Sequence, residues 1–263
     1  MKKIYLVFIL SIHHIDAMSQ LLFPESYAII FDSTRHFKGT VAPSVEIKTL
    51  RQLYIEITNR TDMAFRFKNH GITVANKFEL TRDGDQTILS GGFIYGKYKT
   101  FYDNPFILEH YAQYQWAEAR GLVKKMAIGS NIRYKLLKTQ KGGAFIGLGP
   151  FYEYELWDYR GVPLDRVPSE TMDVDSKEWK INFYISTKRE LSKKIRFEGA
   201  LYFQNEINDP FDNPRWAGAL SFFYSITTHI GFGINLQTIY DFDPVVPVDR
   251  LWFNTFSALE VTF

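Results

Sequence analysis

The stretch LYIEITNRTDMAFRF, residues 53–67, alternates between apolar and polar side chains. A period of two is typical of a β-strand with two unlike faces. A helical face that begins at Leu53 would instead be interrupted by the charge of Arg60. Turn-prone residues at 59–62 leave a hairpin as the alternative, but the alternation continues through them and favours one continuous strand. The odd positions carry Leu53, Ile55, Ile57, Met63, Phe65 and Phe67, and the even positions carry Glu56, Arg60, Asp62 and Arg66.

The same alternation recurs along the chain in segments that are long for a soluble protein. Soluble strands average about 5–6 residues, whereas a strand that crosses a bilayer needs about 9–11. We therefore predict an all-β fold, a single antiparallel transmembrane β-barrel of about 12 strands with both termini in the periplasm, its apolar side chains facing lipid and its polar ones facing the lumen. The predicted strands cover residues 39–48, 53–67, 71–80, 88–99, 105–119, 124–136, 143–156, 179–186, 195–204, 216–226, 230–241 and 251–263.

Short and long connections alternate between these strands. Those near 69–71, 101–105, 139–142, 189–194 and 227–229 are short, and those near 83–86, 117–123, 158–177, 205–214 and 242–250 are longer on average. This is expected when tight turns face the periplasm and loops face outward. Aromatic residues at or near strand ends predict interfacial girdles; they are Tyr102, Trp116, Trp157, Trp179, Trp216, Tyr240 and Trp252.

The composition restricts the possible partners and chemistry. The chain has 263 residues, 46% of them hydrophobic and 17% aromatic, with a formal net charge of +2. Nucleic-acid-binding proteins usually carry a basic patch, so the balanced charge argues against a nucleic-acid partner. The sequence contains no cysteine, which excludes disulfides, thiolate metal sites and a cysteine nucleophile.

The first residues have the layout of a secretory signal peptide. Lys2 and Lys3 precede an apolar run at 4–12, and Ala17-Met18-Ser19 supplies small residues for cleavage. That run is shorter than the roughly 17–25 residues of a spanning helix. We therefore expect a signal peptide at 1–19, an N-terminal periplasmic segment at 20–36 and the barrel at 37–263, in the outer membrane of a Gram-negative bacterium.

Residues 107–137, ILEHYAQYQWAEARGLVKKMAIGSNIRYKLL, combine an acidic residue, a Gln-x-Gln pair, an E-x-R-G-L run and a G-x-N-x-R spacing. Together with YDFDPVVPVD at 240–249, this stretch resembles the family of salt-induced-type outer-membrane β-barrels of unknown function. The resemblance implies an outer-membrane barrel with no settled activity. Residues 48–52 depart from the family pattern by giving only a short first outer loop. The matching residues are Glu109, Gln113, Gln115, Glu118, Arg120, Gly121, Leu122, Gly129, Asn131 and Arg133.

The C-terminal strand is similar to the terminal signature by which outer-membrane barrels are recognised for insertion. Its apolar positions keep one phase and end on an aromatic residue. The expected partners are therefore the barrel-assembly machinery, outer-membrane lipid and lipopolysaccharide. The signature residues are Phe253, Leu259, Val261 and Phe263.

A search for catalytic residues gives no candidate. A lipid hydrolase would need a histidine and a serine within reach of each other, but neither His70 nor His110 has a serine two places on along its strand. His229 has Ser225 nearby, in a predicted periplasmic turn. No calcium-loop pattern is present. We therefore predict no catalytic residue, no metal site and no cofactor.

The inward face of the predicted barrel carries both signs of charge. A ring of one sign would predict ion selectivity, whereas this mixture predicts salt bridges that narrow or fill the lumen. A narrow path for small solutes is the alternative. The predicted lumen-lining residues are Arg60, Asp62, Arg66, Lys77, Glu79, Glu109, Gln113, Arg133, Lys135, Glu153, Glu155, Arg196 and Glu198.

These observations favour an outer-membrane barrel without a catalytic site, acting as a narrow pore or as a structural component of the envelope. A barrel-embedded lipid-modifying hydrolase and a soluble exported β-sandwich that binds a ligand remain the alternatives.

Overall fold

A computed structural model describes residues 36–49, 52–101, 104–139, 141–227 and 230–261. Its twelve strands form one antiparallel sheet in which every strand pairs with its neighbours in the sequence. The strands are β1 (Phe37–Thr49), β2 (Leu53–Phe67), β3 (His70–Asp83), β4 (Gln86–Thr100), β5 (Phe106–Ala117), β6 (Leu122–Thr139), β7 (Gly142–Trp157), β8 (Val174–Glu190), β9 (Ile195–Glu206), β10 (Arg215–Ser225), β11 (Ile230–Asp241) and β12 (Leu251–Val261).

The predicted all-β fold of twelve antiparallel strands is confirmed. The opening stretch forms one strand, β2, so the hairpin alternative at 59–62 is wrong. Two short 3-10 helices, η2 (Glu118–Arg120) and η3 (Leu164–Arg166), lie in the connections. None of the helices in the described part of the chain has the length and apolarity needed to cross a membrane. The predicted signal peptide at 1–19, and all but His36 of the predicted segment 20–36, lie outside the described residues.

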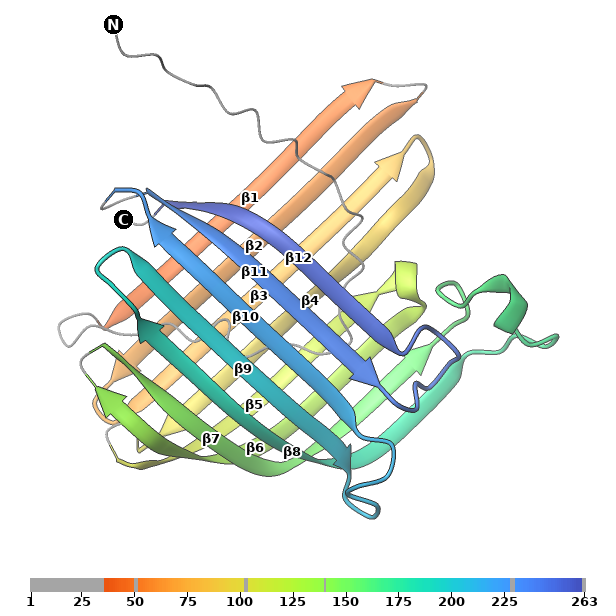
Figure 1. The fold of residues 1–263 in the computed structure, drawn as a ribbon. Helices are drawn as coiled ribbons and strands as arrows, with labels where there is room; N and C mark the ends of the chain where they lie inside the picture. Colours follow the sequence, from red (N-terminus) through yellow and green to blue (C-terminus); the bar gives the residue numbers. More distant parts are fainter. Residues whose placement is uncertain (1–35, 50–51, 102–103, 140, 228–229, 262–263) are drawn as a thin grey trace, which may run out of the picture.

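The sheet curls round so that β9–β12 lie across the wall made by the earlier strands (Figure 1). The turns after β2, β4, β6, β8 and β10 lie at one end of this barrel, on the left in Figure 1, and the longer connections after β5, β7, β9 and β11 lie at the other. The connection at Gly84–Asp85 is a tight turn with Gly84 at a φ of 56°, and not the longer loop expected there. β1 and β12 stand at the two ends of the strand order, and no pairing joins them among the described residues.

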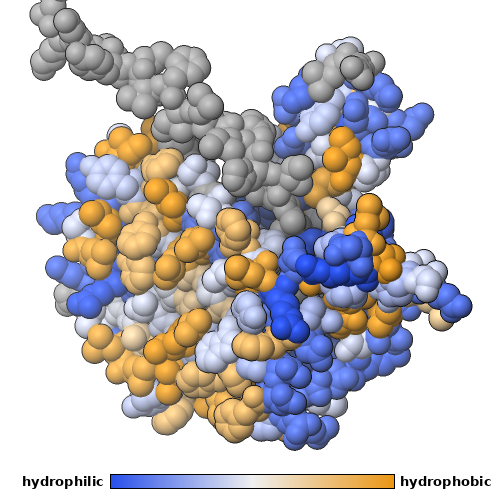
Figure 2. All heavy atoms as spheres, turned by 45° about the vertical axis from the view of Figure 1, so that its right-hand side comes forward, coloured by the Kyte–Doolittle hydropathy of each residue, from blue (hydrophilic) through white to orange (hydrophobic). Residues whose placement is uncertain are grey.

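The two faces of the sheet are inverted relative to a soluble protein. Lys125 is 0% exposed and Glu109 is 1% exposed, whereas Ile128 is 62% exposed and Leu148 is 53% exposed. Soluble proteins bury apolar side chains and expose charged ones. Figure 2 shows the outer face, where hydrophobic residues form broad patches beside hydrophilic ones. An apolar outside and a polar inside are the arrangement of a membrane barrel.

Two of the aromatic residues expected in the girdles point inward instead. Trp157 is 1% exposed and Trp252 is 9% exposed. Both tryptophans occupy inward-facing positions in the alternation of their strands. Their place near a strand end therefore did not decide which face of the sheet they occupy. Trp179 and Trp216 are exposed on the outer face, as a girdle requires, and Tyr102 lies outside the described residues.

Candidate functional site

The barrel interior contains a cluster of buried charges centred on Glu153 of β7. The Glu153 carboxylate lies 2.6 Å from Lys125 Nζ, 2.7 Å from Lys180 Nζ and 3.0 Å from Arg215 Nη1. Glu155, two positions on and therefore on the same face, lies 2.7 Å from Lys125 Nζ. Removing one partner of such a buried group leaves an uncompensated charge, so each member depends on the others.

Arg215 connects this cluster across the interior. It belongs to β10, whereas Glu153 and Glu155 belong to β7, and β8 and β9 separate these strands in the sheet. Arg215 also donates from Nε to Asp241 of β11 at 2.9 Å. One guanidinium thus joins two walls of the barrel, and its planar set of donors suits several carboxylates at once.

A second buried cluster surrounds Glu109 of β5. Its carboxylate lies 3.3 Å from Lys99 Nζ, 3.4 Å from Arg133 Nη1 and 3.8 Å from Lys97 Nζ. Tyr184 of β8 donates its hydroxyl to Glu109 at 2.6 Å. Because β5 and β8 are not neighbours, this hydrogen bond also spans the interior.

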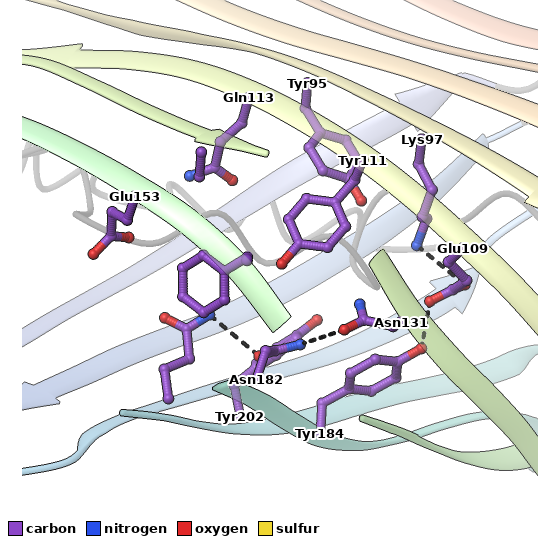
Figure 3. Close-up of a pocket in the computed structure, with 13 residues that line it drawn as sticks. Tyr95, Lys97, Glu109, Tyr111, Gln113, Asn131, Glu153, Asn182, Tyr184 and Tyr202 are labelled. Carbon is purple, nitrogen blue, oxygen red and sulfur yellow. Dashed lines mark hydrogen bonds and ion pairs between the residues drawn. The ribbon is translucent and has the colours of Figure 1, made fainter. Parts of the chain in front are cut away.

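A small polar cavity of about 30 Å³ lies between the two clusters (Figure 3). Asn182 donates to Asn131 at 3.4 Å, and Gln204 donates to Asn182 at 3.2 Å. Gln204 Oε1 is buried and has no hydrogen-bond partner in the described protein. A water needs about 10–15 Å³ of such space and two to four polar partners, so the cavity suits one or two waters.

Glycines on the inward face make room for the tyrosines that fill this interior. A Cβ on Gly147 of β7 would lie 2.2 Å from the Tyr184 ring, and one on Gly129 of β6 would lie 2.7 Å from Tyr111 Oη. Real side chains do not approach so closely. The sequence therefore places small residues opposite large ones, which leaves space for the tyrosine rings.

The loop end has its own polar contacts. Arg160 lies 2.6 Å from Asp158 and 3.2 Å from Glu118. Partial burial lowers the pKa of Arg160, but the hydrogen bond and charge of Asp158, together with Glu118, outweigh it and raise that pKa above its ordinary value. Burial lowers the pKa of Arg120 to about 10, with its guanidinium 5.9 Å from the Trp252 ring centre. Both arginines stay protonated at neutral pH.

The structure divides the predicted lumen residues into three kinds. Glu109, Arg133, Glu153 and Glu155 belong to the two clusters. A second kind forms pairs along one strand, with Lys77–Glu79 at 2.8 Å, Arg60–Asp62 at 3.0 Å and Arg196–Glu198 at 3.2 Å. The remaining predicted positions, Arg66, Gln113 and Lys135, are partly buried and in the same inward phase. The buried ones are Asp62, Glu79, Glu109, Arg133, Glu153 and Glu155.

Arg215 and Asp241 are among the cluster members that the sequence did not single out. Both stand at the loop-end boundary of their strands: Arg215 lies between the predicted loop 205–214 and the predicted strand 216–226, and Asp241 is the last residue of the predicted strand 230–241. A signal was present, because Arg215 is in phase with Ala217 and Ala219, which are buried on the inward face. Of the insertion signature, Phe253 is exposed on β12, and the side chains of Leu259, Val261 and Phe263 lie outside what the structure describes.

A histidine–serine pair on the outer face was also missed. His110 Nδ1 and Ser130 Oγ lie 2.8 Å apart across β5 and β6, at directly opposed positions of the register. The sequence search compared residues only along one strand, so it could not find a partner that pairing between strands supplies. Within the described ranges, no group of three acidic or histidine side chains is placed to hold a metal ion.

The chain is similar to a solved structure and to a protein family. A solved structure described as the NanC porin in a rhombohedral crystal form is 11% identical, with a TM-score of 0.44, and the match covers 86% of this chain and 97% of that one. No curated protein matches the chain at a significant level. Because the family model described as "Protein of unknown function, DUF481" matches residues 56–252, well over half of the sequence, this protein belongs to that family.

Proposed function

We propose that this protein is an integral β-barrel of the outer membrane of a Gram-negative bacterium, with an interior closed to solutes. It then acts as a structural component of the envelope and not as an open pore. The apolar outer face and the charged, paired inner face support the membrane setting. Twelve strands lie between small barrels that side chains fill, at about eight, and open porins of about 16–18, so the contents of the interior decide between the two functions.

The contacts of Arg215 carry the closed interpretation. Arg215 is 6% exposed and joins Glu153 of β7 to Asp241 of β11. A solute that passed here would have to separate buried charges from their partners, which is strongly unfavourable. The Tyr184–Glu109 hydrogen bond at 2.6 Å is a second contact across the interior, in the Glu109 cluster.

Planar-bilayer recording of the purified protein tests this proposal. We expect no steady conductance from the parent protein. We expect measurable conductance from the double variant Glu153→Ala/Arg215→Ala, which removes the crossing contact together with its charges. Arg160→Ala at the loop end serves as the matched control and should stay silent. Stable conductance steps from the parent protein would establish a pore instead.

Export and insertion are part of the same proposal. We expect removal of residues 1–19, recognition of the C-terminal strand by the barrel-assembly machinery, and contact of the outer face with outer-membrane lipid and lipopolysaccharide. Membrane fractionation combined with a gel that compares boiled and unboiled samples tests this, because a folded barrel migrates differently after boiling. Extraction into buffer without detergent would favour the soluble β-sandwich.

The His110–Ser130 pair supports a second candidate function, a lipid hydrolase. A serine within hydrogen-bond distance of a histidine is the arrangement from which a serine nucleophile is activated, and both residues face outward. Esterase activity toward a short-chain lipid ester tests it. The activity should disappear in Ser130→Ala and in His110→Ala and persist in His70→Ala, whose histidine bonds Tyr98 instead. Absence of activity in the parent protein would exclude this function for that ester class.

A further inference from the structure

The outer wall carries a groove of about 410 Å³ over β8–β11. Its floor is the backbone at Gly199 and Gly218, where side chains are missing from an otherwise continuous apolar surface. Ile185, Leu201 and Leu220, each 42–47% exposed, stand along it. Binding sites for small molecules commonly measure about 300–1,000 Å³, so the groove has the size of a ligand site.

The groove is apolar even where threonines line it. Thr187 donates its hydroxyl to the carbonyl oxygen of Gly143 at 3.2 Å, and Thr238 donates its hydroxyl to that of Trp252 at 3.2 Å. Each hydroxyl is therefore engaged with the backbone, which leaves the methyl group for a ligand. A hydrocarbon chain fits this surface better than a polar solute does.

Basic side chains stand at the turn end of the groove. Arg189 follows Thr187 by two residues on the same face of β8 and is exposed opposite Phe197. Lys193 and Lys194 are exposed in the turn that follows. The preceding turn lies beside them, because the backbone N–H of Glu190 donates to the carbonyl of Lys141 at 2.7 Å. Glu190 is the acidic residue of these two turns, and Lys138 and Lys141 add to the positive charge.

We propose that this groove is a binding site for an anionic phospholipid, an inference that rests on the membrane setting proposed above. One acyl chain lies over Gly199 and Gly218, and the phosphate lies against Arg189 and the Lys193–Lys194 turn. A strand advances about 3.3 Å per residue, so Arg189 stands about 7 Å from Thr187 toward the turn. That places the cations at headgroup level and the groove at the depth of the acyl chains. Arginine suits a phosphate because it can donate two parallel hydrogen bonds to it.

Native mass spectrometry of the full chain, released from detergent micelles, tests this site. The protein is offered equal amounts of phosphatidylglycerol and phosphatidylethanolamine with matched acyl chains. We expect retention of one phosphatidylglycerol with about a tenfold preference, because each basic residue near an anionic surface adds to the attraction. Arg189→Gln/Lys193→Gln/Lys194→Gln should remove the preference while some binding of either lipid remains.

Gly218→Leu should abolish retention of both lipids by filling the groove. A Cβ on Gly218 meets Thr238 Cγ2 at 3.3 Å, so the substitution needs only a small adjustment of that methyl group. Gly96→Leu is the matched control, since Gly96 lies on the outer phase of β4 with open space at its Cβ position among the described residues. It should bind lipid like the parent protein.

All variants are first compared with and without boiling on a gel to show that they are folded barrels. Equal retention of the two lipids by the folded parent protein, or unchanged retention by Gly218→Leu, overturns this site and leaves the membrane proposal intact. A chain that fractionates as a soluble protein overturns both.

Discussion

The β6–β7 hairpin and the β1–β2 hairpin share one sequence pattern but differ in what their inward faces contact. In β6 and β7, Lys125, Glu153 and Glu155 are no more than 2% exposed. In β1, the inward-phase side chains of Glu46 and Lys48 are 49% and 41% exposed. Alternation is therefore enough to make a strand, whereas the deepest burial of charged side chains, in β6 and β7, occurs where another wall adds charged partners.

The position of the two hairpins in the sheet explains the difference. β6 and β7 are central in the strand order and face Tyr184 of β8 and Arg215 of β10. β1 is the first strand of that order and pairs with β2 alone among the described residues. We infer that the free energy of unfolding is concentrated around β6–β7, and that β1 contributes mainly its backbone hydrogen bonds.

The strongest test of this comparison is Glu153→Ala. It leaves Lys125, Lys180 and Arg215 buried without their shared carboxylate, and breaking a buried ion pair typically costs about 3–5 kcal/mol. Urea unfolding in detergent micelles, followed by tryptophan fluorescence, measures the change. Glu46→Ala on β1 is the matched control, and loss of an exposed pair with Lys48 should cost no more than about 1 kcal/mol. Equal effects of the two substitutions would break the comparison.

A second test concerns the glycines. Gly147→Ala places a methyl group where the Tyr184 ring lies, with the Cβ 2.2 Å from the ring. Overpacking of this kind typically costs about 1–3 kcal/mol, so the urea midpoint should fall. Gly39→Ala on β1 meets Phe37 Cζ at 3.1 Å, and Phe37 is 52% exposed and free to move aside, so we expect a change within about 0.5 kcal/mol. A midpoint for Gly147→Ala as high as that of the parent would mean that Tyr184 has room to move.

The sequence predicted the strands well because their alternation is local. β2 begins and ends at the predicted residues, and the resemblance of 107–137 to a barrel family is confirmed by the match over 56–252. Strand ends were predicted less accurately, since β8 already begins at Val174 within the predicted long loop. Periodicity shows that a strand has two faces and does not show how far it continues.

The site was less predictable because its contacts cross the barrel. Arg215 and Glu153 are far apart in the sequence, and only the curl of the sheet brings them to 3.0 Å. His110 and Ser130 likewise meet through the β5–β6 register. Predicting such pairs needs the register and the number of strands between them, which the alternation of one strand does not contain.

An effect smaller than those of Glu153→Ala and Gly147→Ala is expected at the loop end, where the Arg160 guanidinium pairs on an exposed surface. Arg160 is paired with Asp158 and Glu118, but its side chain is 53% exposed, so Arg160→Ala should cost no more than about 1 kcal/mol. Its pKa is raised, so the charge persists at neutral and mildly alkaline pH, and added salt should reduce the effect by screening the exposed pair. The effect of Glu153→Ala should change little with salt because its cluster is shielded from ions. A similar salt dependence for both variants would mean that water and ions reach the charges inside β6–β7. The contrast between these buried charges and the exposed charge pairs would then lose its physical basis.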